Sequence, residues 1–401
     1  MTNRLRTLTF STLFPNAERP EHGIFVATRL AHLLASGAVD TRIVAPVPWF
    51  PFRGRRFGEW SRHARVPAQE TWQGVPVVHP RYALPPKIGM TVAPALLAAA
   101  TLPAIRRIIR NGFDFELIDA HYYYPDGVAA AWLGRRLGKP VVITARGTDL
   151  NLIPRHRIAR AQIRWAERNA AASITVCEAL RDRLIELGGR AQHIHTLSNG
   201  VDLQRFRPLD RDALRTALGF TGTTLLSVGH LIERKGVHLT IDALAQLPDV
   251  RLVLVGDGPE RERLVAQAAR MGVADRVRFE GAQPQSRLVD YYNAADALVL
   301  ASSREGMANV LLESMACGTP VLASRVWGTP EVVADPAAGR MLDERSARGI
   351  VNAVYALLAA PPSRAGTRAW AERFDWDTTT TGQIDLFSAI RAQRTWQRTS
   401  A

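Results

Sequence analysis

The sequence is poor in cysteine and lacks a common cofactor motif. Its two cysteines, Cys177 and Cys317, stand far apart among 401 residues, which excludes a disulfide framework and a cysteine metal site and indicates a reducing compartment. No Gly-x-Gly-x-x-Gly occurs, which argues against a nicotinamide or flavin dehydrogenase. No signal peptide is expected, because Arg4 and Arg6 precede only a short strand-like run without an apolar core.

Lysine is also scarce, yet the chain is strongly basic. Only Lys87, Lys139 and Lys235 are lysines, so the formal net charge of +14 comes mainly from arginine. Residues 1–200 hold 27 Lys and Arg against 14 Asp and Glu, whereas residues 201–401 hold 24 against 23. A basic first half suits nucleic acid, an anionic membrane or an anionic substrate. A biased genome composition is the alternative explanation.

The pattern of apolar segments predicts α/β structure. A length of 401 residues is large for a single hydrophobic core and indicates two domains. A strand over 5–14, a helix over 24–35 and a strand over 41–47 form a βαβ unit. Such units build parallel sheets whose ligands lie at the carboxyl ends of the strands. The same rhythm restarts with a strand over 224–228.

One stretch of the second half predicts an anion site. A buried strand over 297–300 is followed by a polar turn, a helix over 307–316 and a strand that starts at residue 320. The start of such a helix presents unpaired N–H groups and a positive dipole, which suit phosphate. Glu305 and Glu313 bracket this helix start and could accept hydroxyl groups; the alternative is an exposed helix residue at 313 and an N-terminal helix charge at 305.

These two glutamates carry a family resemblance. Seven residues separate them within Arg-Glu-Gly-…-Leu-Leu-Glu-Ser-Met-Ala-Cys-Gly-Thr-Pro-Val, which resembles the Glu-x7-Glu signature of the family 4, or group 1, glycosyltransferases. The resemblance implies an α/β GT-B architecture, with two Rossmann-like, doubly wound domains facing across a cleft. Met307 and Ala308 stand where the family often has Phe and Gly, but the backbone donors are kept.

The resemblance implies a donor site for a nucleotide-diphospho-sugar. Glu305 would bind sugar hydroxyls and Glu313 the ribose, while Lys235 with either Arg234 or His230 would contact the diphosphate. The implied donor-binding residues are Gly23, His230, Arg234, Lys235, Glu280, Glu305, Gly306, Met307, Ala308, Asn309, Val310 and Glu313. The residues implied in catalysis are His121, Glu305 and Lys235. No metal and no cofactor is expected.

On the acceptor side, the resemblance points to Gly147, Asp149 and Asn199, with His121 at the carboxyl end of a strand as the family's active-site histidine. Two interpretations of Asp149 stay open, since it could orient His121 or cap the following helix.

Two further segments have open interpretations. Residues 48–57 interleave aromatic side chains with arginines, which suits either a lipid headgroup or acceptor contact or an ordinary surface loop. Residues 88–105 carry no charged side chain, and the two prolines Pro94 and Pro103 favour a packed or amphipathic helix over a membrane span.

The expected protein is a retaining, metal-independent hexosyltransferase of polysaccharide or glycoconjugate synthesis. We place its first domain at 1–204 with a crossover helix at about 378–401, and its donor-binding domain at 205–377. Expected partners are the nucleotide-sugar, a glycan or lipid-linked acceptor and an anionic membrane surface, with no nucleic acid. A cytoplasmic location is expected, peripheral to the inner face of the cell membrane. The alternatives are a sugar-nucleotide 2-epimerase of the same fold and a non-catalytic basic binding protein or sugar-nucleotide sensor.

Overall fold

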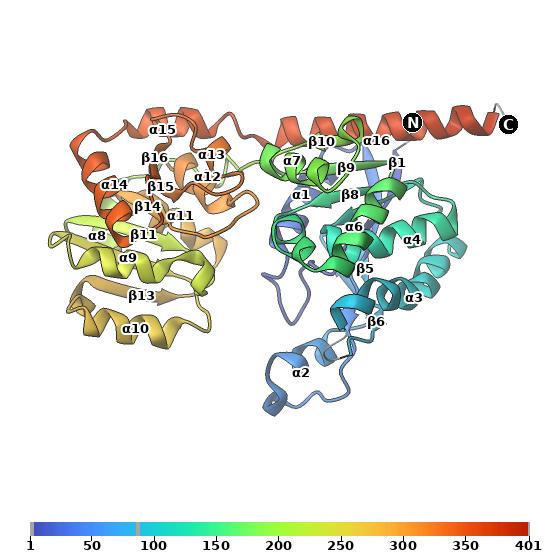
Figure 1. The fold of residues 1–401 in the computed structure, drawn as a ribbon, viewed down its shortest axis with the longest axis horizontal. Helices are drawn as coiled ribbons and strands as arrows, with labels where there is room; N and C mark the ends of the chain where they lie inside the picture. Colours follow the sequence, from blue (N-terminus) through green and yellow to red (C-terminus); the bar gives the residue numbers. More distant parts are fainter. Residues whose placement is uncertain (1–3, 86–88, 400–401) are drawn as a thin grey trace. The chain divides into compact units, whose positions relative to one another are not determined.

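The computed structural model describes residues 4–85 and 89–399, and it divides the chain into two compact units (Figure 1). The first unit is Met1–Leu197 with Asp377–Ala401, and the second is Ser198–Trp376. The second unit thus begins before residue 205, because the segment after Leu197 packs on its end. There the amide of Val201 donates to Phe374 O at 2.8 Å.

The first unit is built on a mainly parallel sheet. Its strands are β1 (Leu5–Phe10), β2 (Val39–Val44), β4 (Gln69–Trp72), β5 (Val75–Val78), β7 (Leu117–His121), β8 (Val141–Ala145), β9 (Ala172–Thr175) and β10 (Ile194–Thr196). They lie in the order β10-β9-β8-β7-β1-β2-β5-β4, and only the β4–β5 pair is antiparallel. The short strands β3 (Val47–Pro48) and β6 (Arg81–Tyr82) pair with each other. The strand order reverses between β1 and β7, which is where ligands bind in sheets of this kind.

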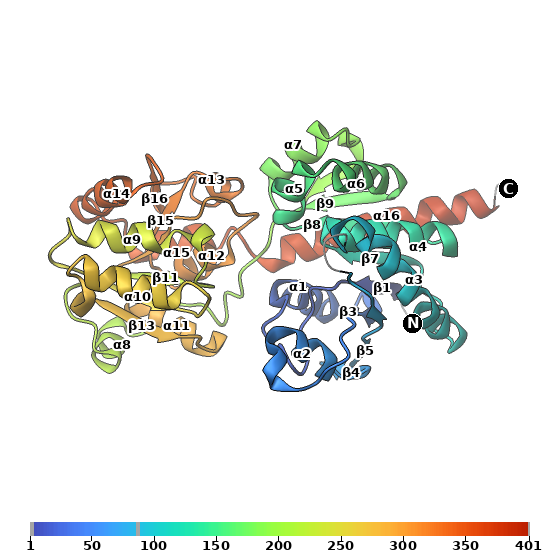
Figure 2. The same ribbon diagram turned by 60° about the horizontal axis from the view of Figure 1, so that its bottom comes forward.

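Helices cover both faces of this sheet (Figures 1 and 2). They are α1 (Ile24–Ala35), α2 (Gly58–Arg65), α3 (Gly89–Arg110), α4 (Val128–Leu137), α5 (Thr148–Asn151), α6 (Arg157–Asn169), α7 (Glu178–Glu186) and α16 (Trp376–Thr399), with the short turns η1 (Arg55–Phe57), η2 (Tyr123–Gly127), η3 (Ile153–Arg155) and η4 (Ala191–His193). One core cluster joins α1 and α16 to the strands through residues such as Leu30, Leu33 and Phe387. Helix α4 lies against β7 and β8 and contacts both α3 and α6.

Helix α3 is the apolar segment whose interpretation was open. Among the described residues, it is long and apolar enough to cross a membrane, with a mean hydropathy of 1.5, but a third of its most apolar stretch is buried within the unit. Pro94 and Pro103 lie inside it, and it contacts α4, β6 and η2. In this structure α3 therefore packs as part of the first unit.

The second unit contains a fully parallel sheet. Its strands are β11 (Thr223–Val228), β12 (Val250–Val255), β13 (Val277–Gly281), β14 (Ala297–Leu300), β15 (Val321–Ser324) and β16 (Gly339–Leu342). They lie in the order β13-β12-β11-β14-β15-β16. The order reverses between β11 and β14, so the turns after these two strands face the expected ligand position.

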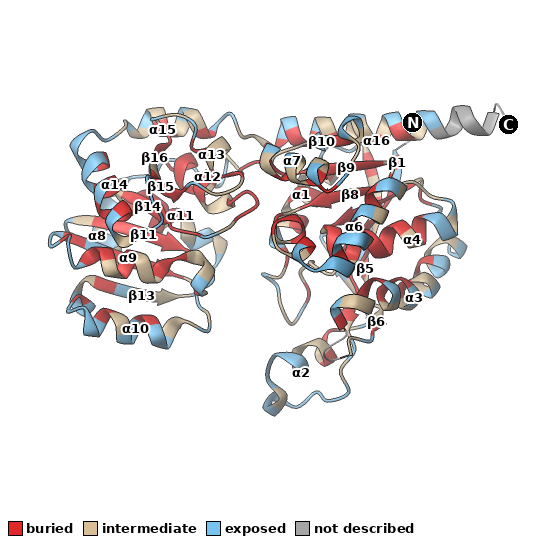
Figure 3. Ribbon diagram, in the orientation of Figure 1, coloured by how far each residue is buried: buried red, intermediate tan, exposed pale blue. Residues whose placement is uncertain are grey.

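The helices of the second unit flank this sheet. They are α8 (Arg211–Leu218), α9 (Val237–Leu244), α10 (Arg261–Arg270), α11 (Gln285–Ala294), α12 (Asn309–Ala316), α13 (Thr329–Val332), α14 (Ala347–Ala359) and α15 (Arg364–Ala371), with η5 (Glu233–Lys235) and η6 (Ala274–Arg276). Figure 3 shows the central strands buried, and helices such as α10 and α14 with an exposed outer face. This is the pattern expected of strands covered on both faces and of helices with one apolar stripe.

Three predicted element boundaries were wrong. The strand predicted over 41–47 is β2, which runs over Val39–Val44, and Val47 belongs to the separate strand β3. Strand β1 ends at Phe10 rather than at residue 14, because the chain turns at Ser11, whose hydroxyl lies 3.3 Å from both Leu13 O and His121 O. Helix α12 begins at Asn309 rather than at residue 307, because Ala308 is extended with φ −85° and ψ 102°. The predicted helix 24–35 is confirmed.

Candidate functional site

Three turns meet at the carboxyl edge of the second sheet, and glycines allow their close approach. Gly256, after β12, has φ +140°, and a Cβ there would lie 2.0 Å from the carbonyl oxygen of Gly229, which follows β11. Gly236 has φ +73°, and a Cβ there would lie 2.0 Å from the carbonyl oxygen of Ala301, which follows β14. A side chain at either position would push the turns apart, so glycine is required for their close backbone approach at this site.

Lys235 and Glu305 form the centre of this site. Lys235 Nζ donates to Glu305 Oε1 at 2.7 Å, Arg234 Nη1 lies 3.2 Å from the same oxygen, and Ser302 Oγ donates to it at 2.7 Å. Burial alone would raise the pKa of Glu305, but the charges of Lys235 and Arg234 outweigh it and hold this pKa below its usual value. Glu305 is therefore ionised at neutral pH and keeps the ammonium group of Lys235 in place.

The first turn of α12 adds backbone donors beside this cluster. Ala308 makes no side-chain cap, and the amide of Leu311 donates to Ala308 O at 3.1 Å, so the donors that this helix start offers a ligand are the amides of Asn309 and Val310. Asn199 lies against the same turn: its amide lies 3.2 Å from Met307 Sδ, and its Nδ2 donates to Asn309 Oδ1 at 3.0 Å. Asn199, predicted on the acceptor side, thus belongs to the second unit and contacts the helix start.

Glu313 is not an exposed helix residue. Its side chain is partly buried and accepts a hydrogen bond from Tyr292 Oη at 2.7 Å. Burial raises the pKa of Glu313, and hydrogen bonds from Tyr292 and Gln285 with the charge of Arg205 oppose that rise. The exposed-helix alternative for Glu313 is therefore wrong, and Tyr292, which no sequence motif singled out, donates to its carboxylate.

The other predicted donor residues lie at the margins of the second unit's site or in the first unit. His230 is exposed, whereas Arg234 contacts the Glu305 loop and also donates to Arg304 O at 2.6 Å. Of the two cations left open beside Lys235, Arg234 is the one at the cluster. Glu280 is the residue before the end of β13 and accepts from Tyr291 Oη at 2.9 Å and from Arg278.

Gly23 lies in the first unit as the residue before α1. It has φ +67°, and a Cβ there would lie 2.2 Å from the backbone carbonyl of Leu13. The close approach that Gly23 allows in this structure is therefore to its own chain.

His121 lies in the first unit, where both ring nitrogens face charged groups. Arg146 Nη2 lies 2.8 Å from Nδ1, and Asp119 Oδ2 lies 3.3 Å from Nε2. Burial lowers the pKa of His121, Asp119 opposes this shift and Arg146 adds to it. Because a guanidinium only donates hydrogen bonds, Nδ1 accepts and the neutral ring carries its proton on Nε2.

Asp119 and Arg146 were missed by the sequence analysis. Asp119 stands two residues before His121 on β7, and the period of two in strands places both side chains on one face, so this signal was available. Gln383 of α16 donates to Asp119 Oδ2 at 3.1 Å and accepts from Arg29 Nε at 2.8 Å. The family resemblance predicted that a crossover helix at about 378–401 joins the first domain, but no sequence pattern predicts that Gln383 meets Asp119 and Arg29.

Asp149 contacts backbone amides rather than His121. Its carboxylate accepts from Tyr123 N at 2.7 Å, Gly147 N at 2.7 Å and Arg146 N at 3.1 Å. Gly147 has φ +142°, which suits glycine at this turn. Neither open interpretation describes these contacts, since Asp119 is the carboxylate beside His121 and α5 has no side-chain cap: Asp149 binds amides that precede the helix.

A second buried carboxylate lies at the switch point of the first unit. Asp126, after β7, accepts hydrogen bonds from the amide and from the hydroxyl of Thr12, after β1, the latter at 2.9 Å. Burial raises the pKa of Asp126 to about 7, and the two bonds from Thr12 limit the rise. Asp126 therefore ties together the two loops on either side of the point where the strand order reverses.

No group of three or more potential metal ligands occurs among the residues that the structure describes. Asp210 and Asp212 have an Asp-x-Asp spacing, but Asp210 caps α8 by accepting from Ala213 N at 3.1 Å. Lys235 and Arg234 are two positively charged groups of this site that could meet a diphosphate.

Comparison with known proteins agrees with this geometry. The family model described as "Glycosyl transferases group 1" matches residues 210–373, and the model described as "Glycosyltransferase Family 4" matches residues 24–205. The D-inositol 3-phosphate glycosyltransferase of Segniliparus rotundus is 32% identical over 324 residues, covering 74% of this chain and 71% of that protein. The teichuronic acid biosynthesis glycosyltransferase TuaC of Bacillus subtilis is 28% identical over 332 residues, covering 81% and 82%.

Among solved structures, Anabaena Alr3699/HepE in complex with UDP-glucose matches with a TM-score of 0.70 and 21% identity, covering 96% of this chain and 99% of that one. This likeness concerns the fold, and it confirms the predicted GT-B class. Both units are matched by family descriptions, and a relative above 30% identity is covered over most of its length. The chain therefore belongs to the group 1 glycosyltransferases of family 4, has their GT-B fold, and is an enzyme of the glycosyl-transfer class.

Proposed function

We propose that this enzyme moves a sugar from a nucleotide-diphospho-sugar to a glycan or lipid-linked acceptor during synthesis of a cell-surface polysaccharide or glycoconjugate. The observation that carries the proposal is that Lys235, Arg234 and the start of α12 meet where the second sheet reverses its strand order. Cations and unpaired amides at such an edge suit a diphosphate. The UDP-glucose bound to HepE and the teichuronic acid in the name of TuaC support this choice of substrates.

The residues act mainly by stabilising charge. When the bond between the sugar and the diphosphate breaks, negative charge grows on the leaving diphosphate, and Lys235, Arg234 and the first amides of α12 stabilise it. Glu305 aligns Lys235 through the 2.7 Å contact and accepts hydrogen bonds from the hydroxyl groups of the sugar. Glu313 accepts hydrogen bonds from the hydroxyl groups of the ribose. These cations supply the positive charge, so the proposed transfer uses neither a metal nor a cofactor, and it retains the anomeric configuration.

His121 is proposed to orient the reacting sugar. The ring is buried and neutral, with Nδ1 facing Arg146 and Nε2 facing Asp119, so it acts through this network and is poorly suited to removing a proton. Gly147 and Asp149 hold the loop after β8 on the acceptor side.

The donor site is tested by thermal unfolding in the presence of UDP-, GDP- and ADP-sugars. We expect one nucleotide family to raise Tm, because a ligand that binds only the folded state stabilises it. Glu313→Ala should abolish the shift, whereas Glu262→Ala, on the exposed face of α10, should preserve it. A shift that survives in Glu313→Ala, or no shift with any donor, contradicts the proposed site.

The reaction itself is tested by following the donor with and without an acceptor. Transfer to a glycan or lipid-linked acceptor, with retained configuration measured by NMR of the new linkage, is the expected result. Conversion of the donor to its 2-epimer without an acceptor contradicts transfer and favours the epimerase.

We also propose that the enzyme works in the cytoplasm, at the inner face of the cell membrane, because the first unit is basic.

A further inference from the structure

Two grooves of the first unit meet at the side chain of Met90, which is 43% exposed and lines both. The smaller groove has a volume of about 610 Å³ and contains the aromatic side chains of Trp60, Tyr82, Tyr122 and Tyr124. Its lining also includes Thr12 and Tyr122, which lie in the loops that follow β1 and β7 at the switch point. It therefore connects the expected ligand edge of the first sheet with the start of α3.

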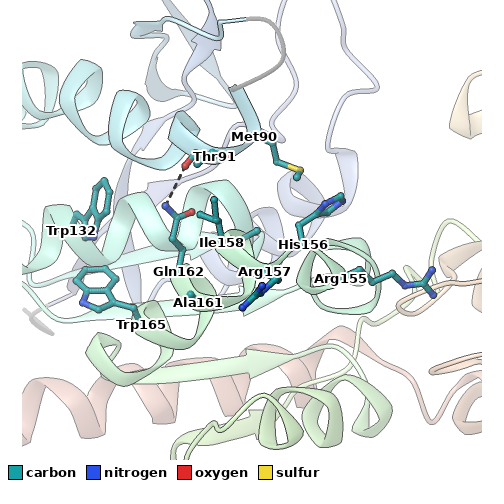
Figure 4. A pocket seen from close by; sticks show the side chains of 11 residues that line it. Met90, Thr91, Trp132, Arg155, His156, Arg157, Ile158, Ala161, Gln162 and Trp165 are labelled. Atoms are coloured by element: carbon teal, nitrogen blue, oxygen red, sulfur yellow. Dashed lines mark hydrogen bonds between the residues drawn. The ribbon is translucent and has the colours of Figure 1, made fainter.

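The larger groove continues from Met90 along α6 and has a volume of about 1090 Å³ (Figure 4). Trp132 and Trp165 lie at one end with their ring centroids 5.8 Å apart, and Ile158, in the middle, is 54% exposed. Gln162 Nε2 donates to Thr91 O at 3.2 Å, which fixes the start of α3 against α6. Exposed large apolar side chains that line a hollow indicate a bound apolar group.

Arginines line the same groove and its neighbour on α6. Arg155 and Arg157 line the large groove, and Arg157 with Arg160 and Arg164 surrounds a smaller hollow next to it. Among the described residues, no carboxylate forms an ion pair with any of these four side chains. Their positive charge is thus uncompensated by the protein and complements an anion.

We propose, resting on the proposed glycosyl transfer, that the acceptor is a lipid phosphate. Its apolar chain lies in the two grooves that meet at Met90, and its phosphate lies against Arg155 and Arg157. The concave shape of the grooves favours a single apolar chain as the bound group. A bilayer surface would instead be bound by a protruding apolar face. The charge favours a phosphate over an uncharged lipid, because Arg155 and Arg157 are exposed and belong to the lining of an apolar groove.

The proposal is tested with dodecyl phosphate below its micelle concentration, with dodecanol and inorganic phosphate as partial probes, by calorimetry on the full chain. Dodecyl phosphate should bind at least about tenfold more tightly than either partial probe, because only it engages both parts of the groove. The double variant Arg155→Glu/Arg157→Glu and the single variant Ile158→Asp should each weaken its binding about tenfold or more, since all three side chains are exposed and line the groove.

The matched control is Arg107→Glu/Arg136→Glu, which makes the same charge change at exposed positions away from both grooves. It should bind dodecyl phosphate within about twofold of the wild type. An equal loss of affinity for dodecyl phosphate in the control and test variants would show that net charge alone determines binding, and it would overturn the proposal. Binding to anionic phospholipid vesicles without binding of dodecyl phosphate would overturn it in favour of a membrane-docking surface.

Donor binding is measured on the same samples, so that the two proposals fail separately. A Tm shift with a nucleotide-sugar but no binding of dodecyl phosphate rejects the lipid phosphate and leaves the transferase in place. Binding of dodecyl phosphate without any donor shift rejects the proposed donor site instead.

Discussion

Asp126 and His121 are buried titratable residues near the switch point of the first sheet, and burial shifts their pKa values in opposite directions. For the carboxyl group of Asp126, burial favours the protonated form, and for the imidazole of His121 it favours the neutral form. The pH dependence of stability therefore separates the two residues.

Replacing Asp126 should change the pH dependence of unfolding. Its pKa is about 7 in the folded protein and near 3.8 in an unfolded chain, so between pH 4 and 7 the folded state holds more protons and stability falls as pH rises. Asn does not titrate, so the free energy of unfolding of Asp126→Asn should rise relative to that of the wild type as the pH is raised from 4 to 7. Urea unfolding at several pH values measures it, and parallel curves for the two proteins would contradict it.

His121 should remain neutral with its proton on Nε2 at pH 7. A folded pKa below the usual 6.5 means that this residue's contribution to stability is present above that value and is lost as pH falls through the folded pKa. Long-range ¹⁵N NMR identifies the tautomer. Arg146→Met should raise the pKa of His121 by removing a nearby cation, and an imidazolium ring at pH 7 in the wild type would refute the assignment.

At the scale of elements, the first turn of α12 can be tested by removing one backbone donor. Asn309 is the first helical residue, where proline is tolerated, and the extended Ala308 before it suits a following proline. Asn309→Pro should weaken nucleotide-sugar binding by about tenfold or more, the usual size of a hydrogen bond to a charged group. Asn309→Ala, which removes only the side chain and its bond to Asn199, is the control and should bind more tightly than the proline variant.

Helix α16 stabilises the first unit through a buried hydrogen-bond network. Gln383 joins Arg29 and Asp119, so Gln383→Ala leaves both partners buried without it. We expect the free energy of unfolding to fall by about 1–3 kcal/mol. Gln393→Ala, on the exposed side of the same helix, should change it by less than about 0.5 kcal/mol in the same denaturant titration.

At the scale of the whole molecule, the charge is divided unevenly between the units. The first unit carries 30 Lys and Arg against 16 Asp and Glu, and the second carries 21 of each, so the entire net charge of +14 lies in the first. Long-range attraction to an anionic surface should therefore act on the first unit alone.

Sedimentation with vesicles tests this asymmetry. The protein should sediment with anionic vesicles at low salt and be released near 1 M salt, where charges are screened beyond about 3 Å. Neutral vesicles serve as the control. Equal binding to neutral and anionic vesicles would show that apolar contacts, rather than the basic first unit, hold the protein there.

The α/β class, the family, and the cluster of Glu305 with Lys235 could be predicted from the sequence. Local patterns carry this information: a strand, a turn and a helix follow one another within about thirty residues, and the motif residues lie in those turns. The ends of β1 and α12 were misplaced, because Ser11 and Ala308 turn the chain through contacts and dihedral angles that apolar periodicity does not report.

The partners of the site residues came only from the tertiary structure. Tyr292 beside Glu313, Gln383 beside Asp119 and the grooves at Met90 join segments that are remote in the chain, and no local pattern specifies which remote side chains will meet. The sequence alone determined the family, the α/β elements and the basic first half, because these depend on residue order and composition. Packing decided which carboxylate faces which cation, because burial and distance set the pKa shifts and hydrogen bonds of the site.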